Sequence, residues 1–184
     1  YIRTTMDKAV ELTQHMSQTI DVFRDFYKPE KERVVFRIKE PVELAVSFVA
    51  PVLKFHSIAL EFEVDPELSA IGYPKEYAQV LLNILSNARD AFKERKVENP
   101  LVKIKAFADG KNAVVTIMDN AGGIPDPIID KIFDIYFTTK DTSGGTGIGL
   151  YMSKNIIENN MGGKLSVENV DQGTQFRIEV NKAG

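Results

Sequence analysis

The sequence predicts an α/β fold: a two-layer sandwich of a mixed, mainly antiparallel sheet with helices on one face, preceded by a long N-terminal helix. Two pairs of short β-rich runs, within residues 101–118 and 164–180, are typical of antiparallel strands joined by turns. Three segments with helical periodicity are interleaved with the β-rich runs, so helices and strands are expected to share one core. With 184 residues, the chain is long enough for one well-cored domain plus an appendage.

Residues 1–28 are expected to form the long helix. The segment contains no Gly or Pro, and its less polar residues recur at alternating steps of three and four: Met6, Ala9, Thr13, Met16, Ile20, Phe23 and Tyr27. This spacing is typical of the seam of a coiled coil or helical bundle. Leu12 and Phe26 widen the apolar stripe, which favours a pairing helix in a longer bundle over a helix packed on its own domain. Pro29 ends the pattern.

The predicted domains are therefore residues 1–29, the pairing helix, and residues 30–184. Within the second, we expect β-rich runs or strands at 33–39, 58–64, 101–108, 113–118, 164–168 and 175–180, and helices at 43–55, 74–95 and 147–160. The first of these helices is indicated by apolar residues at Leu44, Phe48, Val52 and Phe55. Strict alternation indicates the strand at 58–64, Pro74 opens the second helix, and Asp109-Gly110 is a hairpin signal.

Composition and charge exclude several classes of protein. A net charge of −3, with both signs mixed along the chain, gives no electrostatic case for nucleic-acid binding. The sequence has no apolar run of about 18 residues that could span a membrane, and no signal-peptide pattern at its start. It has no cysteine, which excludes disulfides and thiolate metal sites and fits a reducing compartment. We therefore expect a cytoplasmic chain without membrane contact, while a membrane anchor in a longer parent protein stays open.

The first chemical signal lies on the helix predicted at 74–95. Four polar residues stack along the edge of its apolar face: Asn83, Asn87, Asp90 and Glu94. They are either solvated surface residues or half-buried ligands. Asparagine is a poor helix former, so two of them one turn apart need a reason. An amide oxygen beside a phosphate-bound Mg²⁺ is one such reason.

The second signal is the turn-forming sequence at residues 119–125. Asp119 ends an apolar strand and is followed by Asn-Ala-Gly-Gly-Ile-Pro. A carboxylate here can accept a hydrogen bond from an exocyclic amine, which favours adenine over guanine because the 6-position of guanine is itself an acceptor. Glycines such as Gly123 would let the backbone approach a flat base. The alternative is a plain loop.

The third signal is the glycine-rich run at residues 143–150, which leads into the last predicted helix. Glycines at a helix start expose amide N–H groups to an anion. Leu150 stands at the last glycine of a dinucleotide-binding fingerprint, and no Gly-Lys-Ser/Thr follows, so neither common phosphate motif is present. Residues 128–143 are either ordinary core or a movable lid. Lys140 is then either a phosphate contact or a surface lysine.

Taken in order, these segments resemble the N, G1, F and G2 boxes of bacterial sensor histidine kinases, whose ATP-binding domain shares its fold with gyrase B, mismatch-repair ATPases and heat-shock chaperones. Gly173-Thr174 is similar to the G3 position, and the resemblance covers about residues 33–181. It implies an ATP-dependent protein-histidine kinase, with Mg²⁺ as cofactor. The implied catalytic residues are Asn87, as the Mg²⁺ ligand, and Lys140. The implied nucleotide-binding residues are Asn83, Asn87, Asp90, Asp119, Gly123, Lys140, Gly145, Thr146, Gly147, Ile148, Gly149, Leu150 and Thr174.

The resemblance extends to the first segment, which is similar to the second helix of the dimerisation and phosphoacceptor bundle. The implied partners are the phosphoacceptor helix of the same full-length protein, a second copy in a homodimer, and a response-regulator receiver domain. His15 lacks the acidic residue that follows the family's phosphoacceptor, and His56 lies inside the ATP-binding region. Neither is expected to accept phosphate, so this chain is predicted to be a fragment that does not autophosphorylate alone.

Three residues depart from the family pattern. Ala121 replaces a glycine of the G1 box, a change of one methyl group. Asp90 stands where many members carry a phosphate-binding lysine, which makes Lys140 the favoured candidate for a phosphate contact. Asn83 stands where the chaperone and gyrase branch has a water-activating glutamate, and an amide cannot act as a general base. Slow ATP hydrolysis is therefore expected, although a regulatory module without transfer activity and a gyrase- or chaperone-like ATPase stay as alternatives.

Overall fold

A five-stranded sheet in the order β2-β4-β5-β7-β6 forms one layer of the domain in the computed structural model, which describes residues 32–139 and 147–184. Its strands are β2 (Ala59–Val64), β4 (Leu101–Asp109), β5 (Asn112–Asp119), β6 (Lys164–Val170) and β7 (Gly173–Asn181). Strand β2 runs parallel to β4, and the other neighbours pair antiparallel. The predicted mixed, mainly antiparallel sheet is confirmed, including both hairpins.

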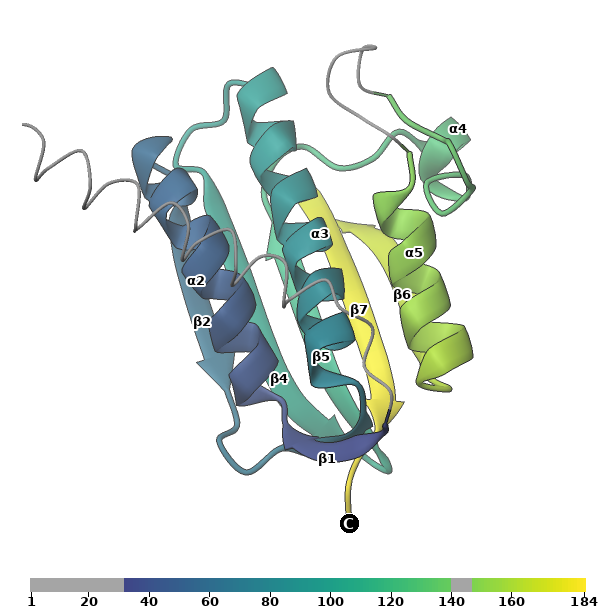
Figure 1. Cartoon of the computed structure of the whole chain (residues 1–184). Coiled ribbons are helices and arrows are strands. Elements are labelled where there is room, and N and C mark those ends of the chain that lie inside the picture. The colour runs from purple at the N-terminus through teal and green to yellow at the C-terminus, as the bar shows by residue number, and fades with distance from the viewer. Residues whose placement is uncertain (1–31, 140–146) are drawn as a thin grey trace, which may run out of the picture.

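Three helices cover one face of this sheet, as Figure 1 shows: α2 (Lys39–Phe55), α3 (Pro74–Glu94) and α5 (Gly149–Asn155). A short helix, α4 (Asp126–Ile129), lies in the connection between β5 and α5. The two-layer α/β sandwich predicted from the sequence is therefore confirmed. The helix predicted at residues 1–28 lies outside the described residues. No helix within the described ranges is long and apolar enough to cross a membrane.

The core lies between α3 and the central strands. The helix buries a broad stripe that includes Tyr77, Leu81 and Leu85, and the sheet presents Ile104 and Ile117 from its helix-covered face. These residues point into the core because every third or fourth residue of a helix lies on one face of the helix, and every second residue of a strand lies on one face of the sheet. Burial of these apolar side chains is the main source of stability of the layer pair.

The residues that helix α2 buries are not the apolar residues from which the helix was predicted. Its buried residues are Pro41, Val42, Ala45, Val49 and Leu53. Of the residues that indicated the helix, Leu44, Phe48 and Val52 are half-buried, and Phe55 is exposed. The helix is apolar on two adjacent sides, so periodicity located the helix without identifying its inner face.

Two further elements differ from the prediction. Strand β1 (Val34–Arg37) pairs with β3 (Ser69–Gly72), a four-residue strand that was not predicted because it is too short to show alternation. The last helix was expected from residue 147, but α5 begins at Gly149, since Gly147 has a left-handed backbone (φ 65°) that no α-helix continues. Its final turns, Ile156–Asn160, form a π-helix, η1.

Candidate functional site

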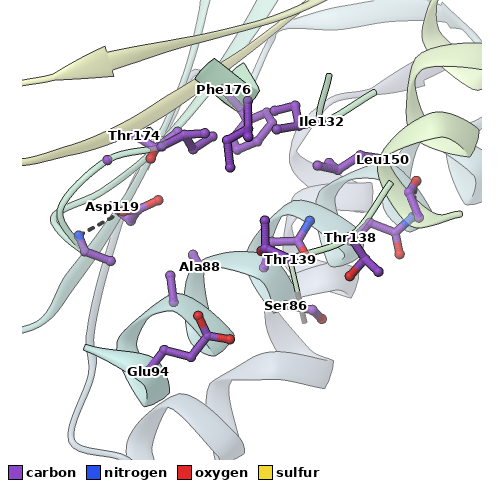
Figure 2. A pocket seen from close by; sticks show the side chains of 18 of the residues that line it. Ser86, Ala88, Glu94, Asp119, Ile132, Thr138, Thr139, Leu150, Thr174 and Phe176 are labelled. Carbon is purple, nitrogen blue, oxygen red and sulfur yellow. Dashed lines mark hydrogen bonds between the residues drawn. The ribbon is translucent and has the colours of Figure 1, made fainter. Parts of the chain in front are cut away.

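A cavity of about 310 Å³ lies between α3, the end of β5 and the start of β7. This volume is at the lower end of the range for small-molecule sites. Residues from four stretches of the sequence line it, within 83–95, 119–139, 147–150 and 174–176, and Figure 2 shows the side chains of several that face it. The predicted site residues among the lining are Asn83, Asn87, Asp119, Gly123, Gly147, Gly149, Leu150 and Thr174. The three polar or glycine-rich signals of the sequence thus meet at one cavity.

Asp119 supplies the buried charge of this cavity. It is the last residue of β5, lies opposite Thr174 in the register of β5 and β7, and is only 7% exposed. Its Oδ1 accepts a hydrogen bond from the N–H of Ala121 (2.9 Å). Burial raises the pKa of the Asp119 carboxyl, while the N–H groups of Ala121 and Thr174 and the charge of Arg95 act in the opposite direction. The carboxylate faces the cavity with acceptor capacity left over (Figure 2).

Small and apolar side chains form most of the remaining wall. Ala88 and Ala91 of α3 and Ala121 leave space on one side, since none has more than a methyl group. Larger apolar groups close the cavity elsewhere: Ile124, Ile128, Ile132, Phe137, Leu150 and Phe176. Phe176 is held by an edge-to-face contact with Phe133 (6.4 Å between centroids). A largely apolar slot whose buried carboxylate is Asp119 suits a flat heterocycle that carries an amine.

The polar edge of α3 is half-buried, as expected, but its members have different surroundings. Asn87 lines the cavity. Asn83 also lines it, and its Nδ2 donates to the carbonyl of Gly149 and to Oγ of Ser153, both at 3.2 Å. Asn83 therefore joins α3 to the start of α5. Asp90 is not among the lining residues and forms an ion pair with Arg89 (2.6 Å), so the cavity does not support its predicted ligand role.

The glycine-rich run is described only from Gly147 onward, so Lys140, Gly145 and Thr146 lie outside the described residues. The carbonyl of Gly147 accepts a hydrogen bond from the N–H of Tyr136 (3.0 Å), and a Cβ at Gly147 would collide with the Tyr136 backbone. A Cβ at Gly149 would instead lie 3.7 Å from the nearest side-chain atom, an ordinary contact. Ile148 is 38% exposed and is not among the lining residues.

Several lining residues were not predicted from the sequence. Thr138, Thr139, Phe137 and Ile132 come from the candidate lid, whose aromatic and apolar residues are equally compatible with an ordinary core. Arg95, directly after α3, also lines the cavity and donates hydrogen bonds to the loop after Asp119. No local pattern marks it. On α3 itself, the small residues Ala88 and Ala91, one turn apart, are a signal that sequence reasoning could have used.

A metal held by protein side chains alone is not supported. Within residues 32–139 and 147–184, no group of three or more His, Cys, Asp or Glu side chains could hold an ion. Mg²⁺, however, commonly takes one or two protein oxygens and completes its shell with phosphate oxygens and water. The amide oxygen of Asn87, on the cavity wall, fits that arrangement.

Comparisons with known proteins point to one family. Residues 72–184 match the family described as histidine kinase-, DNA gyrase B- and HSP90-like ATPases. The sensor protein FixL of Bradyrhizobium diazoefficiens is 29% identical over 99% of this chain. The catalytic domain of histidine kinase ThkA, in a nucleotide-free form, superposes with a TM-score of 0.73 at 29% identity, covering 83% of this chain and 97% of that domain. A complex of ThkA with the response regulator protein TrrA matches with a TM-score of 0.69 at 26% identity, covering 95% of this chain and 49% of the ThkA chain.

These similarities agree with the geometry of the cavity. The matched region begins just before α3 and includes every described element that lines the cavity. The chain spans 36% of the length of FixL, so the similarity concerns one part of such proteins. The chain belongs to the histidine kinase-, DNA gyrase B- and HSP90-like ATPase family, and its domain is the ATP-binding catalytic domain of the sensor histidine kinase type.

Proposed function

We propose that this chain binds Mg²⁺ and ATP in the cavity beside α3 and donates the γ-phosphoryl group to a histidine on a helical bundle. One observation carries the proposal: a buried carboxylate, Asp119, faces an otherwise largely apolar cavity in a domain of histidine kinase type. A carboxylate accepts hydrogen bonds, so it favours the amino group of adenine over the carbonyl of guanine. Thr174, its partner across the strand pair, would support the same contact.

The phosphates would lie toward Asn87 and the glycine-rich run. Asn87 would supply one oxygen to Mg²⁺, which neutralises phosphate charge when bound. Lys140, Gly145 and Thr146 are proposed as phosphate contacts on their sequence positions alone. The protein would then act by placing the donor and acceptor groups and by electrostatic stabilisation, as is usual for phosphoryl transfer.

The proposed partners are those of a two-component system. The phosphoryl group would pass from the histidine to an aspartate of a response-regulator receiver domain. The structure of ThkA with the response regulator TrrA supports this choice of partner, because that kinase shares this fold at 26% identity. Homodimerisation through the helical segment predicted at residues 1–28 is proposed on its heptad-like pattern alone.

A gyrase- or chaperone-like ATPase is the less favoured function. Such an activity needs a base to activate water, and the residue at that position is Asn83. Its amide nitrogen is committed to Gly149 and Ser153, so the side chain is a structural link between two helices. We therefore propose that hydrolysis without an acceptor is slow.

The proposal is tested by mixing this chain with a purified bundle hairpin of a sensor histidine kinase that carries the acceptor histidine. With Mg²⁺ and γ-labelled ATP, acid-labile phosphate should appear on the hairpin, and a hairpin with that histidine changed to glutamine should stay unlabelled. ATP binding without any labelling would instead favour a regulatory module. Rapid release of phosphate without the hairpin would favour an ATPase.

A further inference from the structure

Arg95 forms a two-pronged contact with the loop that follows Asp119. Helix α3 ends at Glu94, and Arg95 is the next residue. Its Nη1 donates hydrogen bonds to the carbonyls of Ala121 (2.6 Å) and Gly123 (2.7 Å). Hydrogen bonds from a charged donor are shorter and stronger than neutral ones. One nitrogen thus ties together two carbonyls that lie two residues apart.

The backbone of this loop is shaped to receive that contact. Gly122 and Gly123 both have left-handed conformations, with φ of 92° and 76°. A Cβ on Gly122 would lie 2.9 Å from Nη1 of Arg95, so a side chain there would displace the guanidinium. The two glycines therefore allow the loop carbonyls to converge on Arg95.

Two asparagines fix the rest of the same loop. Asn169 of β6 pairs with Ile124, accepting from its N–H and donating to its carbonyl, both at 2.7 Å. Asn120 accepts from the N–H of Leu101 (2.8 Å) and donates to the carbonyl of Asn99 (3.0 Å). Both of these links join the loop to the sheet or to its edges. Arg95 is the link that joins it to the end of α3.

This link matters because α3 also carries Asn87. Asn87 lies seven residues before Glu94, the end of α3, which is about 10 Å along the helix axis, and Arg95 is the next residue. A helix is stiff over this distance, so the proposed Mg²⁺ ligand and the loop beside Asp119 are held at a fixed separation. The hydrogen bonds of Asn120, Gly122 and Ile124 run instead to strands and their connections.

We propose that Arg95 is a positioning residue for nucleotide binding, which holds the carbonyls of Ala121 and Gly123 against α3 so that Asp119 keeps its place beside the base. The inference rests on the proposed function, because it concerns the same ATP site. The guanidinium also has an electrostatic effect, since its charge opposes the rise that burial causes in the pKa of Asp119. Glu94, exposed at the end of α3, is the other charged residue at this part of the cavity.

The test compares Arg95→Gln, Arg95→Lys and the control Lys96→Gln. Lys96 is exposed one residue further on and does not line the cavity, so the control removes the same charge from the same segment. We expect Arg95→Gln to weaken ATP binding on the order of tenfold by calorimetry, because Asp119 would no longer be held in place for its charged hydrogen bond to the base. Lysine keeps the charge, but its side chain is one bond shorter and cannot reach both carbonyls equally well. In Arg95→Lys, the logarithm of the Kd for ATP should therefore move less than halfway back from the Arg95→Gln value to that of the unaltered chain. Lys96→Gln should bind as the unaltered chain does.

Two further readouts separate positioning from general stability. Hydrogen exchange of residues 121–124 should become faster in the nucleotide-free Arg95→Gln variant, while exchange in α2 and β4 stays unchanged. ATP affinity should fall on acidification, because Asp119 takes up a proton, and in Arg95→Gln this fall should begin at a higher pH. Adding Arg95→Gln to an Asp119→Asn variant should cause no such shift in pH. The comparison in the Asp119→Asn background shows that the shift in pH comes from Asp119 and not from titration of Glu94.

Unchanged ATP affinity and unchanged loop exchange in Arg95→Gln would overturn the role of Arg95 while leaving the proposed function intact. Full recovery by Arg95→Lys would also overturn it, because charge alone would then explain the effect. If the unaltered chain does not bind ATP, the proposed function itself fails. These failures are distinguishable, because the exchange measurement needs no nucleotide.

Discussion

Replacing Asp119 by asparagine should weaken ATP binding without harming the fold. The two side chains have nearly the same shape, so the cavity keeps its volume. Oδ1 of Asp119 accepts the N–H of Ala121 at 2.9 Å, and the asparagine oxygen would keep that hydrogen bond. The new NH2 group then faces the cavity, where Figure 2 shows the second carboxylate oxygen. A donor would therefore meet the amino group of adenine, which is also a donor.

The expected loss follows from the charge and burial of this contact. A hydrogen bond to a charged group contributes about 1.5–3 kcal/mol. Asp119 is 7% exposed, so little water is available to replace the lost acceptor. At about 1.4 kcal/mol for each factor of ten, the Kd for ATP should rise roughly 10-fold to 100-fold. Isothermal calorimetry with ATP, in the presence of Mg²⁺, measures this directly.

The stability of the same variant provides the control. Burial raises the pKa of Asp119 in the folded chain, so the folded state holds the proton more tightly than the unfolded state. The free energy of unfolding therefore falls as the pH rises through this window, and at neutral pH the buried charge is destabilising. Asp119→Asn removes that charge, so its melting temperature should equal or exceed that of the unaltered chain. Unchanged ATP affinity in a folded variant would remove Asp119 from the base-binding site.

Three more predictions concern the same cavity. Because burial raises the pKa of Asp119, ATP affinity should fall on acidification at a higher pH than an exposed aspartate would give, and calorimetry on Asp119→Asn should show no such fall. Gly147→Ala should lower the free energy of unfolding by about 1–3 kcal/mol in urea denaturation, because its backbone is left-handed and its Cβ would collide with the Tyr136 backbone. Gly149→Ala should be nearly neutral, and equal effects of the two substitutions would contradict this reasoning. Asn83→Asp should lower the free energy of unfolding by about 1–3 kcal/mol, since a carboxylate cannot donate to the carbonyl of Gly149, and an unchanged urea midpoint would show that this link is dispensable.

Most of the fold could be predicted because its signals are local. The β4–β5 hairpin is marked by two apolar runs around a Gly turn, and α3 by an apolar stripe that begins after a proline. Asp119 could be placed at a strand end for the same reason. The order of the three signals then indicated a shared site, and the family resemblance was confirmed by the match over residues 72–184.

The parts that were missed depend on contacts between distant segments. Strand β3 has four residues and is stabilised by pairing with β1, more than thirty residues earlier. Asn83 is fixed by Gly149 and Ser153, and Arg95 by the carbonyls of Ala121 and Gly123. Side chain to backbone hydrogen bonds of this kind leave no periodic trace in a sequence. The start of α5 was placed two residues early because the left-handed conformation of Gly147 follows from its packing against Tyr136.

The most direct test of the proposed site is a crystal structure of this chain with Mg²⁺ and a non-hydrolysable ATP analogue. The adenine amine should lie within hydrogen-bond distance of the Asp119 carboxylate, with Mg²⁺ between the phosphates and the amide oxygen of Asn87. A base bound outside the cavity, or turned so that its amine makes no contact with Asp119, would contradict the assignment of this cavity as the ATP site.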